Sequence, residues 1–134
     1  MIVDAGPLVA LVDATDRHHA ACRELLETHP GPLVVPTMAL AEVVHLIGTR
    51  LGPAPEIALL GDLAAGRFLA EPVAPADWLP IAELVARYRD LGLGTVDASV
   101  VVAWNRLGDR TVATLDRRHF EVLRAEMADV ELLP

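Results

Sequence analysis

Four acidic residues stand where an acidic side chain is unusual. Asp4 follows the apolar start Met-Ile-Val, and Asp97 precedes the apolar run Ala-Ser-Val-Val-Val-Ala-Trp. Asp116 follows Thr-Val-Ala-Thr-Leu, and Glu42 interrupts the run Met-Ala-Leu-Ala-Glu-Val-Val. Charged side chains in apolar segments are rarely buried unless they are paired or bind a metal ion. These four residues are therefore candidates for one shared site.

A shared site of this composition would attract a cation. Two carboxylates about 4 Å apart repel by roughly 1 kcal/mol in water and by about 4 kcal/mol at an effective dielectric constant near 20. Oxygen ligands without cysteine or a histidine cluster suit Mg²⁺ or Mn²⁺ rather than zinc. Such an ion contacts a substrate phosphate, lowers the pKa of a bound water and stabilises the leaving oxygen. The four carboxylates thus indicate metal-dependent hydrolysis of phosphodiester bonds.

Helix capping is the competing explanation for three of the four. Asp4, Asp97 and Asp116 each stand at the start of a predicted helix, where a carboxylate accepts backbone N–H bonds and is favoured by the helix dipole. Taken alone, Asp4 is better explained as a cap. Glu42 lies about a turn and a half inside its helix and cannot be one. We expect capping to be the way in which the carboxylate of Asp4 is held at the site.

Strands alternate with helices along the chain. The predicted strands are short apolar runs: residues 1–3, 33–35, 67–73, 111–115 and 130–133. A helix follows Asp4, and the other predicted helices are residues 13–27, 38–51, 56–65, 75–90, 95–107 and 117–126. Asp16 is expected to cap the helix over 13–27. This alternation predicts an α/β fold, a three-layer α/β/α sandwich with a mainly parallel sheet, in one domain over residues 1–134.

Composition excludes several functions. The net charge is −8, and all 11 basic residues are arginine. Without lysine there is no P-loop lysine, Schiff base or Ser-Lys pair. An acidic chain binds nucleic acid poorly as a whole, so an RNA substrate needs local arginines or metal ions. No stretch is long and apolar enough to span a bilayer and no signal peptide is visible, which favours a cytoplasmic protein without membrane contact.

The four acidic motifs, in this order, carry a resemblance to a known family. I-V-D-A-G, L-A-E-V, V-D-A-S-V-V-V-A and T-L-D-R-R-H-F resemble the ordered acidic motifs of PIN-domain ribonucleases, and most closely those of VapC toxins. The resemblance covers essentially the whole chain. It implies a Mg²⁺- or Mn²⁺-dependent endoribonuclease, a homodimer, and a cognate VapB antitoxin that blocks the site in a hetero-oligomer. By position, Asp4, Glu42 and Asp97 would be the core metal ligands, and Asp116 would complete the site directly or through water.

Other residues near these motifs are weaker candidates. Thr114 and Ser99 could each orient a carboxylate or hold a water, although both readily bond to local backbone instead. Arg117 and Arg118 could grip a substrate phosphate. His119 stands beside Phe120 and is interpreted as a packed helix residue rather than a general base.

A non-catalytic protein is the main alternative. In that interpretation the acidic residues are caps, and excess apolar surface binds a partner or a second copy of the chain. The metal-hydrolysis interpretation instead predicts RNA products with 5′-phosphate and 3′-hydroxyl ends, because a metal-activated water replaces the ribose 2′-hydroxyl as nucleophile. An arginine of the antitoxin could take the place of the metal in the acidic pocket.

Overall fold

The computed structural model describes all of residues 1–134, and its centre is a sheet of five parallel strands. The strands are β1 (Ile2–Val3), β2 (Val34–Pro36), β3 (Leu69–Glu71), β4 (Thr111–Ala113) and β5 (Glu131–Leu133). Their order across the sheet is β3-β2-β1-β4-β5, and every neighbouring pair is parallel. The strands are rich in Val, Leu and Ile because a parallel sheet is covered on both faces.

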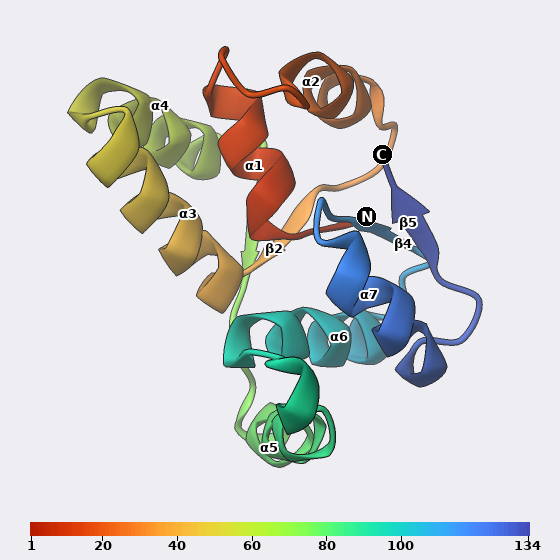
Figure 1. Cartoon of the computed structure of the whole chain (residues 1–134). Coiled ribbons are helices and arrows are strands. Elements are labelled where there is room, and N and C mark those ends of the chain that lie inside the picture. The colour runs from red at the N-terminus through yellow and green to blue at the C-terminus, as the bar shows by residue number, and fades with distance from the viewer.

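Seven helices cover the sheet. They are α1 (Ala5–Val12), α2 (His19–Thr28), α3 (Thr37–Arg50), α4 (Pro53–Ala64), α5 (Trp78–Arg87), α6 (Thr95–Leu107) and α7 (Arg117–Leu123). In Figure 1 the helices α1 to α4 lie on one side of the strands, and α6 and α7 lie on the other with α5 beyond α6. Right-handed connections explain this division, since the chain moves outward from β1 to β3 and then crosses back to β4 and β5. The predicted three-layer α/β/α sandwich is confirmed.

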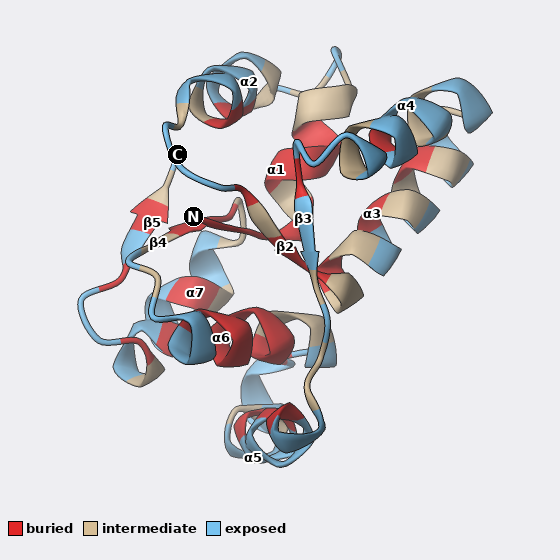
Figure 2. Cartoon of the chain, turned by 180° about the vertical axis from the view of Figure 1, so that it is seen from behind, coloured by how far each residue is buried: buried red, intermediate tan, exposed pale blue.

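The core lies between the sheet and its two helical layers. Ile2, Val35 and Val112 on the three central strands are fully buried. The central turns of α6 are also buried, from Ala98 to Trp104. Figure 2 shows the buried segments concentrated in the central strands, α1 and α6, with the edge strand β3 and the outward faces of α2, α4 and α5 exposed. None of the helices combines the length and the apolar character needed to cross a membrane.

Three predicted helices are shortened or divided in the structure, and the one predicted over 117–126 ends as α7 at Leu123 and continues as a 3₁₀ turn (Arg124–Glu126). The helix predicted over 13–27 begins only at His19, because the carboxylates of Asp13 and Asp16 hold residues 13–18 in turns. Asp16 accepts from the backbone of His18 at 2.7 Å but is not the helix cap. The helix predicted over 75–90 is divided into a 3₁₀ turn, α5 and a second 3₁₀ turn (Arg89–Leu91). Local side-chain bonds to backbone competed successfully with the helix over residues 13–18.

The strand order places a topological switch point between β1 and β4. The connection after β1 leads to one side of the sheet, and the connection after β4 leads to the other. Their carboxyl ends are joined, since the backbone N–H of Asp4 donates to the carbonyl of Ala113 at 2.9 Å. Ligands of open parallel α/β sheets bind outside the strand ends at such a point. Asp4 and Asp116 both follow strands that end there.

Candidate active site

Asp4 is the most deeply buried of the four carboxylates, with 5% of its surface exposed. It occupies the cap position of α1, but its side chain makes no capping hydrogen bond. Its Oδ2 instead accepts from the hydroxyl of Thr114 at 2.8 Å. The expectation that capping holds this carboxylate is therefore wrong; a hydroxyl from the neighbouring strand end holds it.

Glu42 reaches the site from α3, in the layer opposite α6. It is exposed, although its neighbour Val43 is fully buried. Thr37 begins α3 directly after β2, which starts the helix at the carboxyl edge of the sheet. Glu42 therefore comes from one helical layer and Asp97 from the other.

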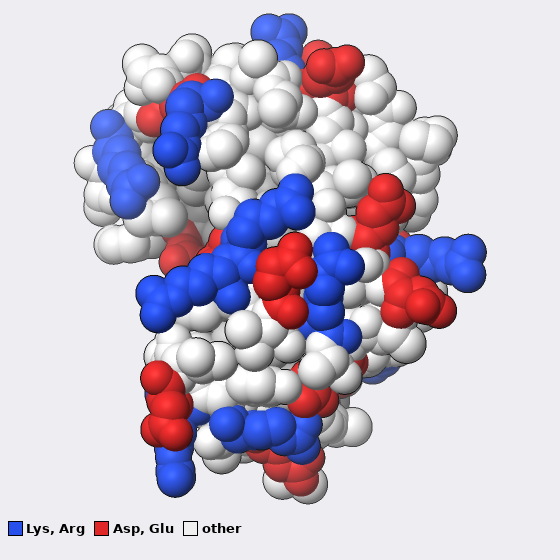
Figure 3. Space-filling model, turned by 45° about the vertical axis from the view of Figure 1, so that its right-hand side comes forward, with Lys and Arg blue, Asp and Glu red and all other residues white.

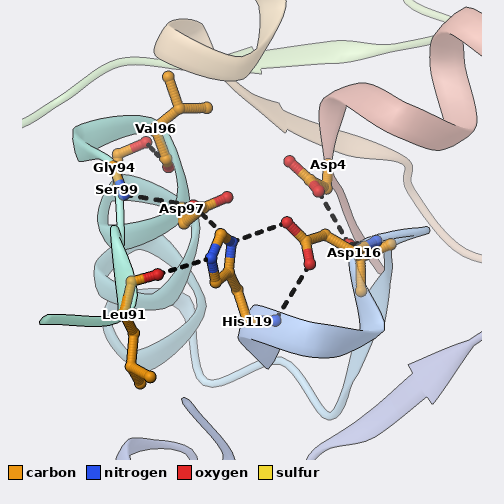
Figure 4. A network of polar contacts seen from close by, with 9 residues as sticks. Asp4, Leu91, Gly94, Val96, Asp97, Ser99, Asp116 and His119 are labelled. Carbon is orange, nitrogen blue, oxygen red and sulfur yellow. Dashed lines mark hydrogen bonds and ion pairs between the residues drawn. The ribbon is translucent and has the colours of Figure 1, made fainter. Parts of the chain in front are cut away.

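Asp97 and Asp116 approach each other through His119. Asp97 stands in the first turn of α6, where its Oδ2 lies 3.4 Å from the backbone nitrogen of Gly94. Asp116 caps α7, because its Oδ1 accepts from the backbone N–H of His119 at 3.0 Å. The His119 ring lies between the two carboxylates, with Nδ1 2.8 Å from Oδ2 of Asp116 and 3.5 Å from Oδ2 of Asp97 (Figure 4).

The four carboxylates meet in one cavity. It has a volume of ≈ 430 Å³, and it is lined by Asp4, Ala5, Gly6, Glu42, Leu46, Asp97, Leu115 and Asp116. A cavity of ≈ 400 Å³ between α5 and α6 also contains charged residues. Its arginines Arg87 and Arg106 are paired with Glu126 and Asp77, however, so it has no comparable excess of acid.

The negative charges of this site act on one another. Burial raises the pKa of Asp4 to about 6, against the lowering effects of the Ala5 backbone N–H and the Thr114 hydroxyl, and the carboxylates of Asp97 and Glu42 add to the rise. Burial also raises the pKa of Asp97, with Asp116 adding to this effect and His119 opposing it. Carboxylates that resist ionisation in this way are stabilised by a nearby cation.

The supporting candidates have different positions. Thr114 is fully buried; its hydroxyl donates to Asp4 and accepts from the backbone N–H of Asp116 at 3.0 Å. Ser99 contacts none of the four carboxylates, because its hydroxyl donates to the carbonyl of Val96 at 2.6 Å. The supporting role expected for Ser99 has no counterpart in these contacts.

The two predicted phosphate-binding arginines lie at the start of α7. Arg117 donates to the carbonyl of Pro134 and lies 3.9 Å from Glu121, whereas Arg118 is exposed and has neither kind of contact. Figure 3 shows arginine side chains gathered in a band on one face, with acidic side chains between and beside them. The chain thus has local positive surface despite its net charge of −8.

The donor set fits a divalent cation. Asp4, Glu42, Asp97 and Asp116 line the cavity, and no arginine lines it. The side chains close enough to share one ion as the structure stands are Asp97, Asp116 and His119. Hard oxygen ligands are those that Mg²⁺ and Mn²⁺ prefer. Burial is the main cause of the raised pKa of Asp4, and a bound cation would offset the cost of ionising this buried carboxylate.

Comparison with known proteins agrees with this geometry. The family model described as the PIN domain matches residues 1–125. The chain belongs to the PIN-domain family. It is also 39% identical over 124 residues to Ribonuclease VapC26 of Mycobacterium tuberculosis, a match that covers 92% of each protein. The resemblance to VapC-type PIN proteins is confirmed.

Solved structures share the PIN fold of this chain. The crystal structure of Mycobacterium tuberculosis VapC20, described as a toxin that cleaves the sarcin–ricin loop, superposes with a TM-score of 0.84 at 20% identity. That match covers 99% of this chain and 98% of the other. The crystal structure of FitAcB from Neisseria gonorrhoeae gives a TM-score of 0.68 at 17% identity, covering 99% and 96%.

His119 is the residue at this PIN site that the sequence interpretation assigned to packing. Its side chain contacts two of the four acidic residues, so the packing interpretation is incomplete. The spacing between Asp116 and His119 could have indicated this contact. A residue three positions after Asp116 lies on the same side of the helix that Asp116 begins.

Proposed function

We propose that this chain is a metal-dependent endoribonuclease of the VapC type, acting as a toxin that a cognate antitoxin inhibits. The observation that supports it most is the convergence of Asp4, Glu42, Asp97 and Asp116 in one cavity beside the switch point of a PIN fold. VapC26, the curated relative that covers most of the chain, is named a ribonuclease. Together these favour hydrolysis over a non-catalytic role.

The four carboxylates would hold the cation, one or two ions in number. Such an ion, when bound, supplies a water of lowered pKa and stabilises the leaving oxygen of a phosphodiester. Thr114 fixes the orientation of Asp4 by its hydrogen bond, which keeps one ligand in place before substrate arrives. Asp116 is held through both its backbone and its side chain, by Thr114 and by the N–H of His119.

The substrate would be RNA, bound through its phosphates. Arg118 has an exposed guanidinium with no competing ion pair, and it lies two residues from Asp116. Arginine is well suited to phosphate because its planar group donates two parallel hydrogen bonds. Arg117 is the weaker candidate, because the carbonyl of Pro134 already accepts from it.

The partner would be an antitoxin with a basic residue where it meets the cavity. An arginine inserted among the carboxylates would supply the positive charge that the cavity lacks. We also propose a homodimer, since large apolar side chains such as Trp78 and Leu79 on α5 are exposed by 53% and 68%. Sedimentation showing a monomer at micromolar concentration would contradict the dimer.

Sequencing of RNA ends after brief expression tests the activity. The wild-type chain should produce new ends with 5′-phosphate and 3′-hydroxyl groups, and Asp4→Asn should remove them while the protein stays folded. Asp90→Asn is the matched control, because it removes the same charge from a side chain that is 99% exposed. Ends carrying a 2′,3′-cyclic phosphate, or equal cleavage by Asp4→Asn, would contradict the proposed mechanism.

A further inference from the structure

His119 presents an unusual pair of contacts at the two nitrogens of its ring. Nε2 lies 3.2 Å from the carbonyl oxygen of Leu91, and Nδ1 faces Asp97 and Asp116 (Figure 4). A carbonyl oxygen only accepts hydrogen bonds, so Nε2 carries the proton of this contact. In the neutral ring Nδ1 then has a free lone pair, which is the form of nitrogen that binds metal ions.

The direction of the Nδ1 contact is that of neighbouring ligands rather than of a hydrogen bond. Nδ1 is buried and has no hydrogen-bond partner, although Oδ2 of Asp116 is only 2.8 Å away. The distance from Nδ1 to Oδ2 would allow a hydrogen bond, so the angle between the two groups is what prevents one. Ligands of one ion point at the ion and not at each other, which produces short separations of this kind.

The separations also suit a single ion. Atoms of Asp97, Asp116 and His119 that could bind a metal all lie within 4.8 Å of one another. Ligands about 2.1 Å from an octahedral ion are about 3 Å apart when adjacent and about 4.2 Å apart when opposite. The Nδ1 distances of 2.8 and 3.5 Å are therefore close to those of adjacent ligands.

The remote side of the ring supports the same arrangement. Histidines that bind metal ions usually donate their other ring N–H to a carboxylate or a backbone carbonyl, which fixes the orientation of the ring. The carbonyl of Leu91 accepts this bond in the present structure. Leu91 ends the 3₁₀ turn that precedes α6, so the bond also ties α7 to the segment that leads to Asp97.

We propose that His119 supplies a nitrogen ligand through Nδ1 to a cation shared with Asp97 and Asp116, and that this ligand makes the position prefer Mn²⁺ to Mg²⁺. Imidazole nitrogen suits first-row transition ions, whereas Mg²⁺ prefers oxygen. The inference deepens the proposed function by naming the cation. The role of this cation in RNA cleavage rests on the proposed function, whereas its binding by His119 does not.

Two substitutions separate the proposed ligand atom, Nδ1 of His119, from the hydrogen bond between Nε2 and the Leu91 carbonyl. His119→Gln places an amide near the position of Nε2, so a donor to the Leu91 carbonyl remains and no group replaces Nδ1. His119→Asn places its amide near Nδ1 and loses the tie. His29→Gln is the matched control, because His29 follows α2 and lies outside the acidic cavity.

Electron spin echo spectroscopy of bound Mn²⁺ gives a direct readout, because a coordinated ¹⁴N modulates the echo. Wild type and His29→Gln should show the nitrogen modulation, and His119→Gln and His119→Asn should lose it. Titrations should show Mn²⁺ affinity at least about tenfold weaker in His119→Gln, since losing an outer partner of a ligand already costs that much. Mg²⁺ affinity should change by less than about threefold, because Mg²⁺ gains little from nitrogen.

Three results would overturn the inference: no Mn²⁺ binding by the wild type, no nitrogen modulation in its echo, or equal losses of Mn²⁺ and Mg²⁺ affinity in His119→Gln. A ring that only pairs with the two carboxylates gives the second result. RNA cleavage that depends on Asp4 but comes without nitrogen modulation would leave the proposed function standing and remove this inference. Nitrogen modulation without RNA cleavage would support this inference and contradict the proposed function.

Discussion

A single hydroxyl organises the carboxylates at the scale of residues. Thr114 donates to Asp4 and accepts from the backbone of Asp116, so it joins the first acidic motif to the last. Its side chain is fully buried. This hydrogen bond therefore helps to fix the orientation of Asp4.

Replacing Thr114 by Val should weaken both the fold and the site. Valine has the same shape but leaves a buried carboxylate oxygen and a backbone N–H without partners, which costs about 1–3 kcal/mol of unfolding free energy. Urea unfolding measures the loss, and RNA cleavage should fall with it. Thr114→Ser keeps a hydroxyl and should retain most of both; equal losses in Ser and Val would show that the methyl group matters instead.

The pKa of Asp4 predicts a pH dependence of stability in the metal-free protein. Its folded-state pKa is raised from 3.8 to about 6, so the protonated form is favoured by folding. The resulting stability is fully present below pH 4 and is lost as the pH rises through 6, a change of about 3 kcal/mol. Asp4→Asn should remove this part of the dependence and be more stable than wild type at pH 8 in the presence of a chelator.

Unfolding in urea between pH 4 and 8, with a chelator present, measures this effect. Asp90→Asn serves again as the control and should follow the wild-type curve, because its side chain is exposed. A wild-type curve without a fall between pH 4 and 6 would show that Asp4 is not disfavoured as a carboxylate.

At the scale of elements, an arginine on α6 fixes the connection that crosses from β3 to α5. Arg106 donates to Asp77 at 3.1 Å, to Glu71 at 2.7 Å and to the carbonyl of Pro72 at 3.2 Å. Asp77 is buried, with 6% of its surface exposed. These contacts lie at the end of α6 remote from Asp97, so they hold the helix without entering the cavity.

Arg106→Gln should therefore reduce stability and spare the chemistry. We expect a loss of about 1–3 kcal/mol in unfolding free energy, because the buried carboxylate of Asp77 loses its charged donor. Arg110→Gln is the control, since Arg110 is exposed and has no ion pair. Cleavage per folded molecule should stay near the wild-type value in both variants. A stability loss no greater in Arg106→Gln than in Arg110→Gln would contradict the structural role.

At the scale of the whole molecule, the acidic cavity lies between the two helical layers, where the sheet reverses its direction of winding. Glu42 comes from one layer, Asp97 from the other, and Asp4 and Asp116 from the strand ends between them. An ion bound by all of them would therefore connect both helical layers and both strand ends, in addition to the direct contact between α3 and α6. Removing the ion should therefore lower the stability of the whole chain.

Metal binding should raise the melting temperature. A cation at about 100 times its dissociation constant adds about 2.7 kcal/mol to the free energy of unfolding, or about 10 °C at this chain length. Differential scanning fluorimetry with Mg²⁺ or Mn²⁺ against a chelator measures the shift. Asp97→Asn should lose most of it and Asp90→Asn none. An identical melting temperature with metal and with chelator would exclude the cation site.

The sequence alone determined the fold class and the four acidic positions. Strand and helix periods are local properties, and the regular alternation of the two specifies a parallel sheet with helices on both sides. The helix over 95–107 was predicted with the bounds that α6 has. Glu42 could be singled out because a charge inside an apolar helix has no local explanation.

Only the tertiary structure decided what holds each carboxylate. The bond from Thr114 to Asp4 spans almost the whole chain, so no local pattern could reveal that it replaces the expected cap. The pairing of His119 with Asp97 likewise depends on how α7 packs beside the start of α6. Hydrogen bonds between distant residues form only when the sheet brings the strand ends together, and periodicity contains no information about them.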